Sequence, residues 1–517
     1  MDVNDGRPSP VVCQFSVNEA LHLYTVQEKL LKSGHQVDFD FSDTFVAEKP
    51  PEMMSDLETF FRGKSIFITG ATGFVGKILI EKLLRAFPDL DAIYLLIRNK
   101  GDKNAARRLQ KIVDCELFSL LKVQRPEAMQ KLKVISGDVT KNGLGISESD
   151  HQTLIEKVNI VFHSAATVKF DEDLKLALDI NLQGTKRIIE LCKSLKHLEA
   201  LVHVSTAYSN CNRREVDEII YEASWDPEKI IQATYWMNAE LIAEHTPQII
   251  GNWPNTYTFT KALAEQVVSE ASKDLPITIV RPSIILSTAS DPFPGWIESW
   301  NGPTGIVSAA SKGVYNSFFI HQGAVVDMVP ADVVVNLLIC SAWALACKKT
   351  KNLTIYNCCV SNQKPLKWGD FISQCLFFVR KNPSEKVFWY PKAHAYSNRF
   401  LYNIGCFFRH VFPAYLMDTI NLFVKSKNEI KLVPIQKKLA KASKAVEYFT
   451  THEWLFKNEN FVNLSNLLSQ EDNKKFSVDI SNICWSSYLE TYVLGIRKHI
   501  FGESDCTIPK ARQMLKW

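Results

Sequence analysis

The sequence predicts an α/β fold in which a doubly wound parallel sheet is followed by a substrate-side insertion and a mainly helical C-terminal domain. Short apolar runs rich in β-branched residues alternate with helical stretches from Lys64 onward. Continuous apolar runs of this kind are typical of parallel strands that are covered on both faces. From about residue 396 the chain becomes helical, aromatic and basic, which marks a second domain.

Length and composition exclude several classes of protein. The chain has 517 residues, of which 46% are hydrophobic and 22% charged, so it is not a disordered protein. Its 60 Lys and Arg against 56 Asp and Glu leave a net charge of only +4, spread along the chain, which argues against nucleic-acid binding. The 12 cysteines are scattered without a CxxC pair, and we interpret them as reduced thiols of a cytosol-facing protein.

Neither a secretory signal nor a membrane span is expected. The first residues contain no basic and apolar leader regions. The apolar stretches 333–347 and 411–424 are each shorter than the roughly 20 residues that a spanning helix needs. We also expect no metal, because HExxH and paired cysteine ligands are both missing from the sequence.

The elements follow in a regular order. Residues 1–60 contain one weak helical stretch and the Pro50-Pro51 break, and we treat them as an extension. A loop rich in proline, glycine and tryptophan from Asp291 to Gly305 predicts the substrate side, because ligands of open α/β sheets bind beyond the carboxyl ends of the strands. Between these segments, six runs predict strands: 65–68, 93–97, 133–135, 160–162, 201–204 and 277–280.

A glycine-rich turn between the first strand and the first helix is the strongest functional signal. Glycines three residues apart at this junction permit a tight turn and a close approach of the backbone to a pyrophosphate at the helix N-terminus. The alternative is that the glycines only shape a loop. The turn predicts a Rossmann-type dinucleotide site formed by Thr69, Gly70, Thr72, Gly73, Phe74, Val75 and Gly76.

Positive charge at the end of the second strand favours NADPH over NADH. Arg98 and Lys100 stand where an NAD-specific site usually has an acidic residue, and they suit a 2′-phosphate. The alternative is that both are solvated surface cations. After the third strand, the Asp138 carboxylate is expected at the adenine amino group, next to Val139.

Four residues predict a proton-transfer set. Tyr257 and Lys261 are four residues apart and therefore share a helix face, some fifty residues after the strand end Ser205-Thr206. We expect Lys261 to lower the pKa of Tyr257, and a hydroxyl from Thr206 or Ser205 to bind the carbonyl oxygen that gains charge on hydride attack. Tyr257 would then act as the general acid.

Taken together, these motifs resemble the extended short-chain dehydrogenase/reductases, and within them the fatty acyl-CoA reductases of animals, particularly insects. The resemblance covers nearly everything after residue 55. It is carried by the segments 61–64, 76–84, 203–208, 281–283, 300–305, 327–332, 355–357, 410–418 and 495–498.

The resemblance adds site residues to this set. It implies that Asn181 supports a proton relay, although a simple polar helix residue is the alternative. It also implies that Ser164, Ala165 and Ala166 line the cofactor after the fourth strand, that His163 is structural, and that Pro282 lies at the cofactor site.

The resemblance also implies an activity and a place in the cell. It implies NADPH-dependent reduction of long-chain fatty acyl-CoA to a primary alcohol through a bound aldehyde, with release of CoA. It further implies that the protein is intracellular and is associated with a cytosol-facing membrane surface, that of the endoplasmic reticulum, the peroxisome or a lipid droplet. The aromatic stretch 407–423 would lie in a bilayer interface or else form a core. A homodimer, and the use of the alcohol in wax or ether lipid, are left open.

Three alternatives to this activity remain. The chain could be an acyl-CoA reductase that stops at the aldehyde, a dehydrogenase or epimerase of sterols or nucleotide sugars, or a non-catalytic relic that binds NADPH. The domains expected are 1–60 as an extension, 61–395 as the NADPH-binding reductase domain with its substrate region at about 285–395, and 396–517 as the helical domain.

Overall fold

The computed structural model describes residues 55–99, 101, 104–424, 431–481 and 483–516. By their contacts, Met54–Trp517 form a unit separate from Met1–Met53, and the structure below is that of the former. Most of the predicted extension therefore lies outside the described residues. The described chain begins with the helix α2 (Asp56–Phe61), which is capped by the Ser55 side chain.

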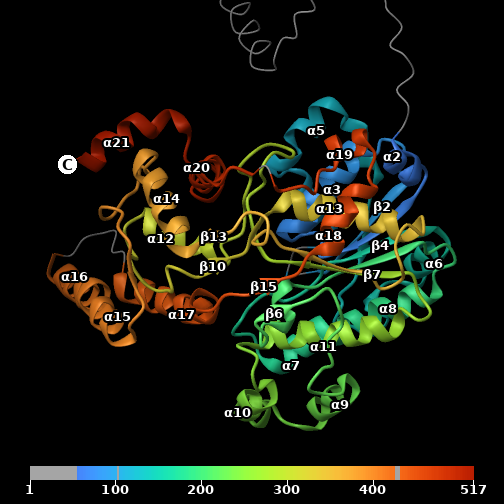
Figure 1. The fold of residues 1–517 in the computed structure, drawn as a ribbon, viewed down its shortest axis with the longest axis horizontal. Helices are drawn as coiled ribbons and strands as arrows, with labels where there is room; N and C mark the ends of the chain where they lie inside the picture. Colours follow the sequence, from blue (N-terminus) through green and yellow to red (C-terminus); the bar gives the residue numbers. More distant parts are fainter. Residues whose placement is uncertain (1–54, 100, 102–103, 425–430, 482, 517) are drawn as a thin grey trace, which may run out of the picture. The chain divides into compact units, whose positions relative to one another are not determined.

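A parallel sheet of seven strands lies in the right half of this unit as drawn in Figure 1. The strand order is β12-β7-β5-β4-β1-β2-β3, and every neighbouring pair is parallel. This confirms the predicted fold class and all six predicted strands. The seventh strand, at the edge, was not predicted. The bounds are β1 (Ser65–Thr69), β2 (Ala92–Ile97), β3 (Leu132–Ser136), β4 (Val158–His163), β5 (Ala200–Val204), β7 (Ile277–Pro282) and β12 (Ile355–Cys358).

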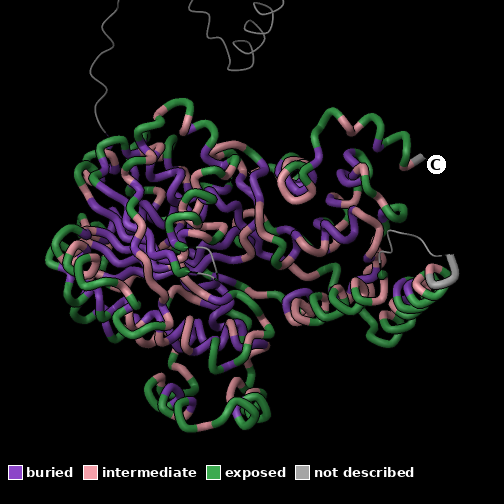
Figure 2. Tube along the Cα trace, turned by 180° about the vertical axis from the view of Figure 1, so that it is seen from behind, coloured by how far each residue is buried: buried purple, intermediate pink, exposed green. Residues whose placement is uncertain are grey.

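Helices cover both faces of the sheet, which explains why the strands are apolar throughout. Ile66 and Ile68 of β1 pack in one hydrophobic cluster, whereas Phe67 between them packs in another. Figure 2 shows the strands buried in the interior. The first cluster includes α3 (Phe74–Ala86) and α13 (Ala331–Ala346), and the second includes α8 (Gly184–Ser194) and α11 (Thr256–Ala271).

The apolar stretch 333–347 forms most of α13, and this helix is buried almost entirely against the sheet. It is apolar on all sides because it lies in the core of a large unit. Across the described part of the chain, no helix combines the length and apolarity that a bilayer crossing requires.

The chain reverses direction along the sheet between β1 and β4. From β1 it runs outward through β2 and β3, and it then returns to β4 on the other side of β1. Loops that leave the carboxyl ends of such neighbouring strands diverge to opposite faces and open a crevice between them. The smaller elements before β7 are α4 (Ala105–Val113), η1 (Glu116–Phe118), α5 (Ser119–Gln124), η2 (Pro126–Lys131), η3 (Asn142–Gly145), α6 (Glu148–Lys157), α7 (Leu174–Ala177), η4 (Leu178–Gln183), η5 (Ala207–Asn210), β6 (Glu215–Val216), α9 (Pro227–Trp236) and α10 (Ala239–Ile250).

The chain after β7 is interwoven with the sheet-bearing part. Strand β15 (Leu455–Phe456) pairs with β6, which precedes β7, whereas β14 (His394–Tyr396) pairs with β9 (Ser317–Phe319) within the later part. The other elements are β8 (Ile284–Leu286), α12 (Pro303–Ser311), β10 (Val325–Val326), β11 (Met328–Pro330), β13 (Leu366–Lys367), α14 (Trp368–Lys381), α15 (Arg399–Cys406), η6 (Phe407–Val411), α16 (Phe412–Val424), α17 (Leu432–Thr451), α18 (Glu459–Leu467), α19 (Gln470–Lys475), α20 (Trp485–Gly495), η7 (Ile496–Ile500), η8 (Asp505–Thr507) and α21 (Ile508–Lys516).

A surface of exposed apolar side chains covers α15, η6 and α16, and we call it the aromatic face. Phe408 is 64% exposed and Phe412 52%. The alternative that this stretch forms a core is therefore wrong for these residues. The large apolar residues of the aromatic face are Phe400, Leu401, Ile404, Phe407, Phe408, Val411, Phe412, Tyr415, Leu416, Met417 and Ile420.

Candidate active site

The glycine-rich turn forms a cradle that only glycine permits. Gly70 has a φ of +75°, and a Cβ there would lie 2.6 Å from Ser164 Oγ and 2.8 Å from the Ala165 backbone nitrogen. A Cβ on Gly76 would overlap the Gly70 carbonyl oxygen, so α3 packs directly against the turn. Gly73 caps α3, and the first helical N–H groups are left free to bind an anion.

The Thr69 side chain holds this turn in place through hydrogen bonds. Its Oγ1 accepts a hydrogen bond from the Ala165 N–H at 3.2 Å and also bonds His163 Nδ1 at 2.7 Å. The other ring nitrogen, His163 Nε2, lies 3.1 Å from Thr185 Oγ1. Burial lowers the pKa of His163 to about 3, and the Lys261 charge adds to this effect, so the ring is neutral. His163 is structural, as the resemblance implied.

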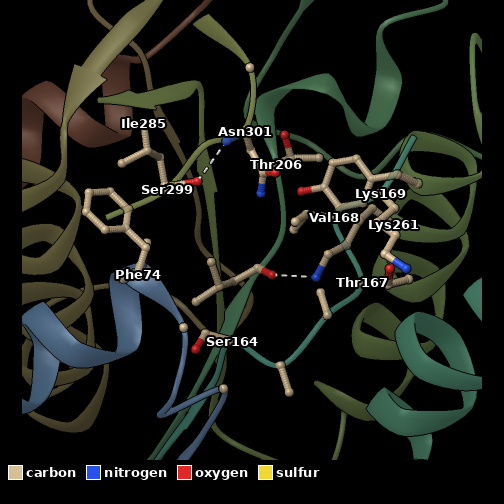
Figure 3. Close-up of a pocket in the computed structure, with 18 of the residues that line it drawn as sticks. Phe74, Ser164, Thr167, Val168, Lys169, Thr206, Lys261, Ile285, Ser299 and Asn301 are labelled. Carbon is tan, nitrogen blue, oxygen red and sulfur yellow. Dashed lines mark hydrogen bonds between the residues drawn. The ribbon is translucent and has the colours of Figure 1, made fainter. Parts of the chain in front are cut away.

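A cavity of about 1050 Å³ opens at the carboxyl ends of the strands, and Figure 3 shows its interior. Nearly all of the predicted site residues line it. Thr69 and Asn181 do not, and Lys100 lies outside the described residues. The predicted residues that line the cavity are Gly70, Thr72, Gly73, Phe74, Val75, Gly76, Arg98, Asp138, Val139, Ser164, Ala165, Ala166, Ser205, Thr206, Tyr257, Lys261 and Pro282.

Tyr257 and Lys261 lie on successive turns of α11, as their spacing predicted. Lys261 Nζ donates to the Val204 carbonyl oxygen at 2.8 Å, a bond drawn in Figure 3. Burial lowers the pKa of Lys261 to about 8, opposed by the Glu265 charge. The ammonium form still predominates at pH 7.

The pKa of Tyr257 departs from the sequence-based expectation. Burial raises this pKa to about 12, and only a hydrogen bond with Thr206 opposes the rise. Lys261 was expected to lower it, but the Lys261 ammonium is directed at the Val204 carbonyl. Tyr257 therefore keeps its proton at neutral pH and is held in the form of a proton donor.

The two hydroxyls at the end of β5 have different partners. Ser205 Oγ donates to Glu265 Oε1 at 2.5 Å, and this carboxylate forms a buried ion pair with Arg281 at 2.7 Å. Thr206 Oγ1 donates to the Pro282 carbonyl oxygen over a long 3.4 Å, accepts from the Tyr208 N–H at 3.3 Å and interacts with Tyr257. Ser205 is thus engaged in the scaffold, whereas Thr206 is the hydroxyl available beside Tyr257.

Asn181 connects two segments behind the cavity. It lies in a π-helical turn, and its Nδ2 donates to Thr260 Oγ1 at 3.0 Å. Its Oδ1 accepts from the Thr167 N–H at 2.9 Å. These bonds tie the loop after β4 to α11 one residue before Lys261, so Asn181 acts on the site through its neighbours.

Two guanidinium groups meet at the end of β2. Arg108 of α4 donates to the Arg98 carbonyl oxygen at 2.6 Å and to Thr72 Oγ1 at 3.2 Å. The Arg98 side chain is 53% exposed and lies 3.9 Å from the Asp138 carboxylate. Burial, followed by the Arg98 charge, lowers the pKa of Arg108, and the Asp138 charge opposes this shift. Asp138 also accepts from the Thr140 hydroxyl at 3.0 Å.

Aromatic and apolar residues form the opposite end of the cavity. The Phe170 ring stacks on Tyr257 with centroids 5.9 Å apart and contacts Phe449 of α17 at 5.2 Å. The predicted substrate loop supplies Trp300 to the same lining. It is attached to α3, because Glu298 accepts from Lys77 at 2.6 Å and Asp291 pairs with Lys82 and Arg85.

Sequence reasoning missed three contributors to this site. Glu265 continues the i, i+4 series of Tyr257 and Lys261, a signal that was visible in the sequence. Arg108 and Phe449 carried no such signal, because their positions depend on how α4 and α17 pack. No group of three or more candidate metal ligands occurs within the described ranges of the chain.

The comparisons with known proteins agree with this geometry. Residues 68–338 and residues 409–503 both match families described as male sterility protein. The chain is 39% identical to fatty acyl-CoA reductase 1 of Xenopus laevis and 38% identical to that of Homo sapiens, over 89% of each chain. It is 39% identical to fatty acyl-CoA reductase 2 of Bos taurus over 90% of each chain.

Solved structures show the same fold at lower identity. The reductase domain of a nonribosomal peptide synthetase from Mycobacterium tuberculosis matches with a TM-score of 0.57 and 18% identity, over 86% of this chain and 95% of that domain. The terminal R domain of the myxalamid PKS-NRPS pathway matches with a TM-score of 0.55 and 18% identity, over 85% and 92%. Both share the Rossmann-type reductase architecture.

Proposed function

The chain belongs to the fatty acyl-CoA reductase family and is an oxidoreductase with a nicotinamide cofactor site. On this premise we propose that it reduces long-chain fatty acyl-CoA to the primary alcohol with NADPH. The observation that carries the proposal is that Tyr257, Lys261 and Thr206 line the same cavity as the dinucleotide turn. The apolar end of that cavity suits a fatty acyl chain.

The residues at the turn fit a dinucleotide phosphate. Gly70 packs against Ser164 and Ala165, and Gly76 packs against the Gly70 carbonyl, so the turn lies close to the start of α3 and lines the cavity where a pyrophosphate would bind. Arg98 and Arg108 present two cations where the adenosine ribose would lie, which supports a 2′-phosphate and hence NADPH. When bound, NADPH supplies a hydride to the acyl carbon.

The protein's own groups position the carbonyl and supply a proton. The Thr206 hydroxyl donates to the carbonyl oxygen as negative charge develops there. Tyr257 protonates the alkoxide that forms, and Lys261 would hold the ribose of the nicotinamide. The Phe170 and Phe449 rings cover this position and exclude water from it.

The overall reaction consumes two reducing equivalents. Acyl-CoA, two NADPH and two protons give the alcohol, free CoA and two NADP⁺. The first reduction breaks the carbon–sulfur bond with CoA as the leaving thiol and leaves the aldehyde in the cavity. The second reduces that aldehyde at the same residues.

Product analysis tests this proposal. Detergent-purified protein is incubated with palmitoyl-CoA and either NADPH or NADH, the nicotinamide absorbance is followed, and the products are identified by gas chromatography. We expect hexadecanol, two NADPH consumed per CoA released, and little reaction with NADH. Hexadecanal at one NADPH per CoA would reduce the activity to a single reduction, and no oxidation across chain lengths would overturn the proposal.

The role of Tyr257 has its own test. Tyr257→Phe should lower kcat about 10²- to 10⁴-fold, as expected for loss of a general acid, with NADPH affinity retained. Tyr235→Phe, which changes an exposed tyrosine, is the control. Unchanged turnover in Tyr257→Phe would remove this residue from the mechanism.

We further propose that the enzyme works on a cytosol-facing lipid surface, of the endoplasmic reticulum, the peroxisome or a lipid droplet, and that the aromatic face binds it. Acyl-CoA partitions into such surfaces through its chain. The aromatic face contains Arg409 but no exposed carboxylate between Arg399 and Met417. The nearby Asp418 carboxylate is occupied, since it accepts from the Leu432 and Val433 N–H groups at 2.8 and 2.9 Å. An exposed apolar helix face with a basic border is typical of interfacial binding.

Vesicle flotation tests this second proposal. The protein should float with phosphatidylcholine vesicles that contain anionic lipid, and the double variant Phe408→Glu/Phe412→Glu should lose most of this binding. Phe377→Glu is the matched control, because Phe377 is an exposed phenylalanine of α14 outside the aromatic face. Equal flotation of the double variant would contradict the proposal.

A further inference from the structure

A second, smaller cavity lies behind the substrate end of the main one, and we call it the side cavity. It has a volume of about 50 Å³ and is enclosed by α12, α14, α17 and the region of β9. Five residues line both cavities: Pro303, Ile306, Trp368, Val446 and Thr450. The two spaces are therefore neighbours that share one wall.

The lining shows in which direction the side cavity extends. On α14, Trp368 lines both cavities, whereas Cys375 and Val379 line only the side cavity. On α12, Ile306 lines both and Ala310 only the side cavity. Both helices thus lead away from the main cavity.

The chemistry of the side cavity excludes charged ligands. Its lining contains no ionised side chain. Burial raises the pKa of the Cys375 thiol, which stays protonated. Thr450 Oγ1 is already bonded to the Phe319 carbonyl oxygen at 3.0 Å. A pyrophosphate would find no cation here, and the Trp368 Nε1–H, which has no hydrogen-bond partner in the described structure, belongs to a residue of the wall shared with the main cavity. A hydrocarbon has no charge or hydrogen bond to lose on entering.

We propose that the side cavity receives the methyl end of the acyl chain and that Ala310, Cys375 and Val379 at its far end set the longest chain accepted. This inference rests on the proposed function and adds the residues that determine chain length. The small volume suits the last few carbons, with the rest of the chain lying in the main cavity. Extra bulk at the far end excludes long chains and leaves short ones unaffected.

Chain-length profiles of filling variants test the inference. Cys375→Phe, and the milder Ala310→Val, should lower kcat/KM for stearoyl-CoA about tenfold or more relative to wild type, while lauroyl-CoA stays within about twofold. Val379→Ala should shift the preference toward longer chains. Ser373→Leu, which adds bulk on the exposed outer side of α14, is the matched control and should change neither rate.

The outcome is separable from that of the proposed function. Melting temperature is measured for each variant, and binding of lauric and stearic acids is measured by calorimetry, a readout that needs no turnover. An unchanged ratio between the two chain lengths in folded Cys375→Phe and Ala310→Val, in both rate and binding, overturns the inference. If the wild type is inactive but binds stearic acid, and the filling variants lose this binding, the proposed reaction is rejected while the side cavity remains the site of the chain end.

Discussion

At the residue scale, neighbouring side chains of the same chemistry have different partners in the active site. Ser205 and Thr206 are adjacent hydroxyls, and the sequence left open which one contacts the substrate. Both line the cavity just after β5, but Thr206 is the one that bonds Tyr257. Ser205 instead joins Glu265, which is paired with Arg281 in the interior.

Paired substitutions separate these two hydroxyls. Thr206→Val should lower kcat about 10- to 1000-fold, because it removes a donor to the developing oxyanion. Ser205→Ala should mainly cost stability, about 1 to 3 kcal/mol, because Glu265 loses a buried donor. Steady-state kinetics and thermal melting measure the two effects. The reverse pattern, with Ser205→Ala inactive and Thr206→Val active, would exchange their roles.

The pKa of Lys261 predicts the upper limit of the pH range for activity. Because burial lowers this pKa to about 8, turnover should fall as pH rises through about 8 and the ammonium is lost. The folded protein binds this proton less tightly than the unfolded chain, so this group makes stability rise with pH above 8. Unfolding of this origin therefore cannot mimic the loss. The pH profile of kcat is the measurement, and Lys261→Arg should move the decline to higher pH.

Spacing determined how much of the site could be predicted. The i, i+4 relation of Tyr257 and Lys261 and the position of the glycines are local properties, so both were visible in the sequence. Arg108 could not be found, because its contact with Thr72 joins α4 to the glycine-rich turn through tertiary packing. The raised pKa of Tyr257 could not be predicted either, because it results mainly from burial, which depends on tertiary packing.

At the element scale, the packing of α3 against the glycine-rich turn shapes the cofactor site. α3 rests on the Gly70 carbonyl at one end and binds the substrate loop along its length, through Lys77 to Glu298 and through Lys82 and Arg85 to Asp291. The same helix therefore positions both the glycine-rich turn and the loop that was predicted to form the substrate side.

Adding a methyl group at this contact should displace the turn. Gly76→Ala places a Cβ against the Gly70 carbonyl oxygen, and we expect NADPH affinity to fall about tenfold or more with a loss of about 1 to 3 kcal/mol in stability. Gly323→Ala is the control, since no atom lies within 4 Å of a Cβ built there. Fluorescence titration with NADPH measures the effect, and equal affinities in the two variants would refute it.

Element types were predictable where two signals agreed. The six predicted strands combine β-branched runs with flanking turn residues. β12 was not predicted, because the polar Asn357 interrupts its apolar run after Ile355 and Tyr356. For α13, composition alone could not separate a buried core helix from a membrane segment, since both are apolar on all sides.

At the scale of the whole molecule, the last part of the chain is joined to the sheet by buried polar contacts. Asn357 of the edge strand β12 donates to the Val216 carbonyl oxygen at 3.1 Å and to the Lys457 carbonyl oxygen at 2.7 Å. Its own N–H donates to Glu218 at 2.9 Å. Three segments that are distant in sequence thus depend on one side chain.

Removing that side chain should loosen this junction without touching the cofactor site. Asn357→Ala leaves two buried carbonyls without their donor, at about 2 to 4 kcal/mol in the free energy of unfolding. Denaturant unfolding measures the loss, and NADPH affinity of the folded variant should match wild type. A midpoint equal to that of wild type would show that the junction contributes nothing to stability.

The strands of this sheet are not synthesised in the order in which they lie side by side. β7 ends at Pro282, but its outer neighbour β12 ends only at Cys358, so one edge of β7 waits without a partner while the intervening chain is made. At about 5–20 residues per second this wait lasts about 4 to 15 s. An open apolar strand edge is a template for association with other chains. The nascent chain is therefore most prone to association during that interval, which is longest when translation is slow.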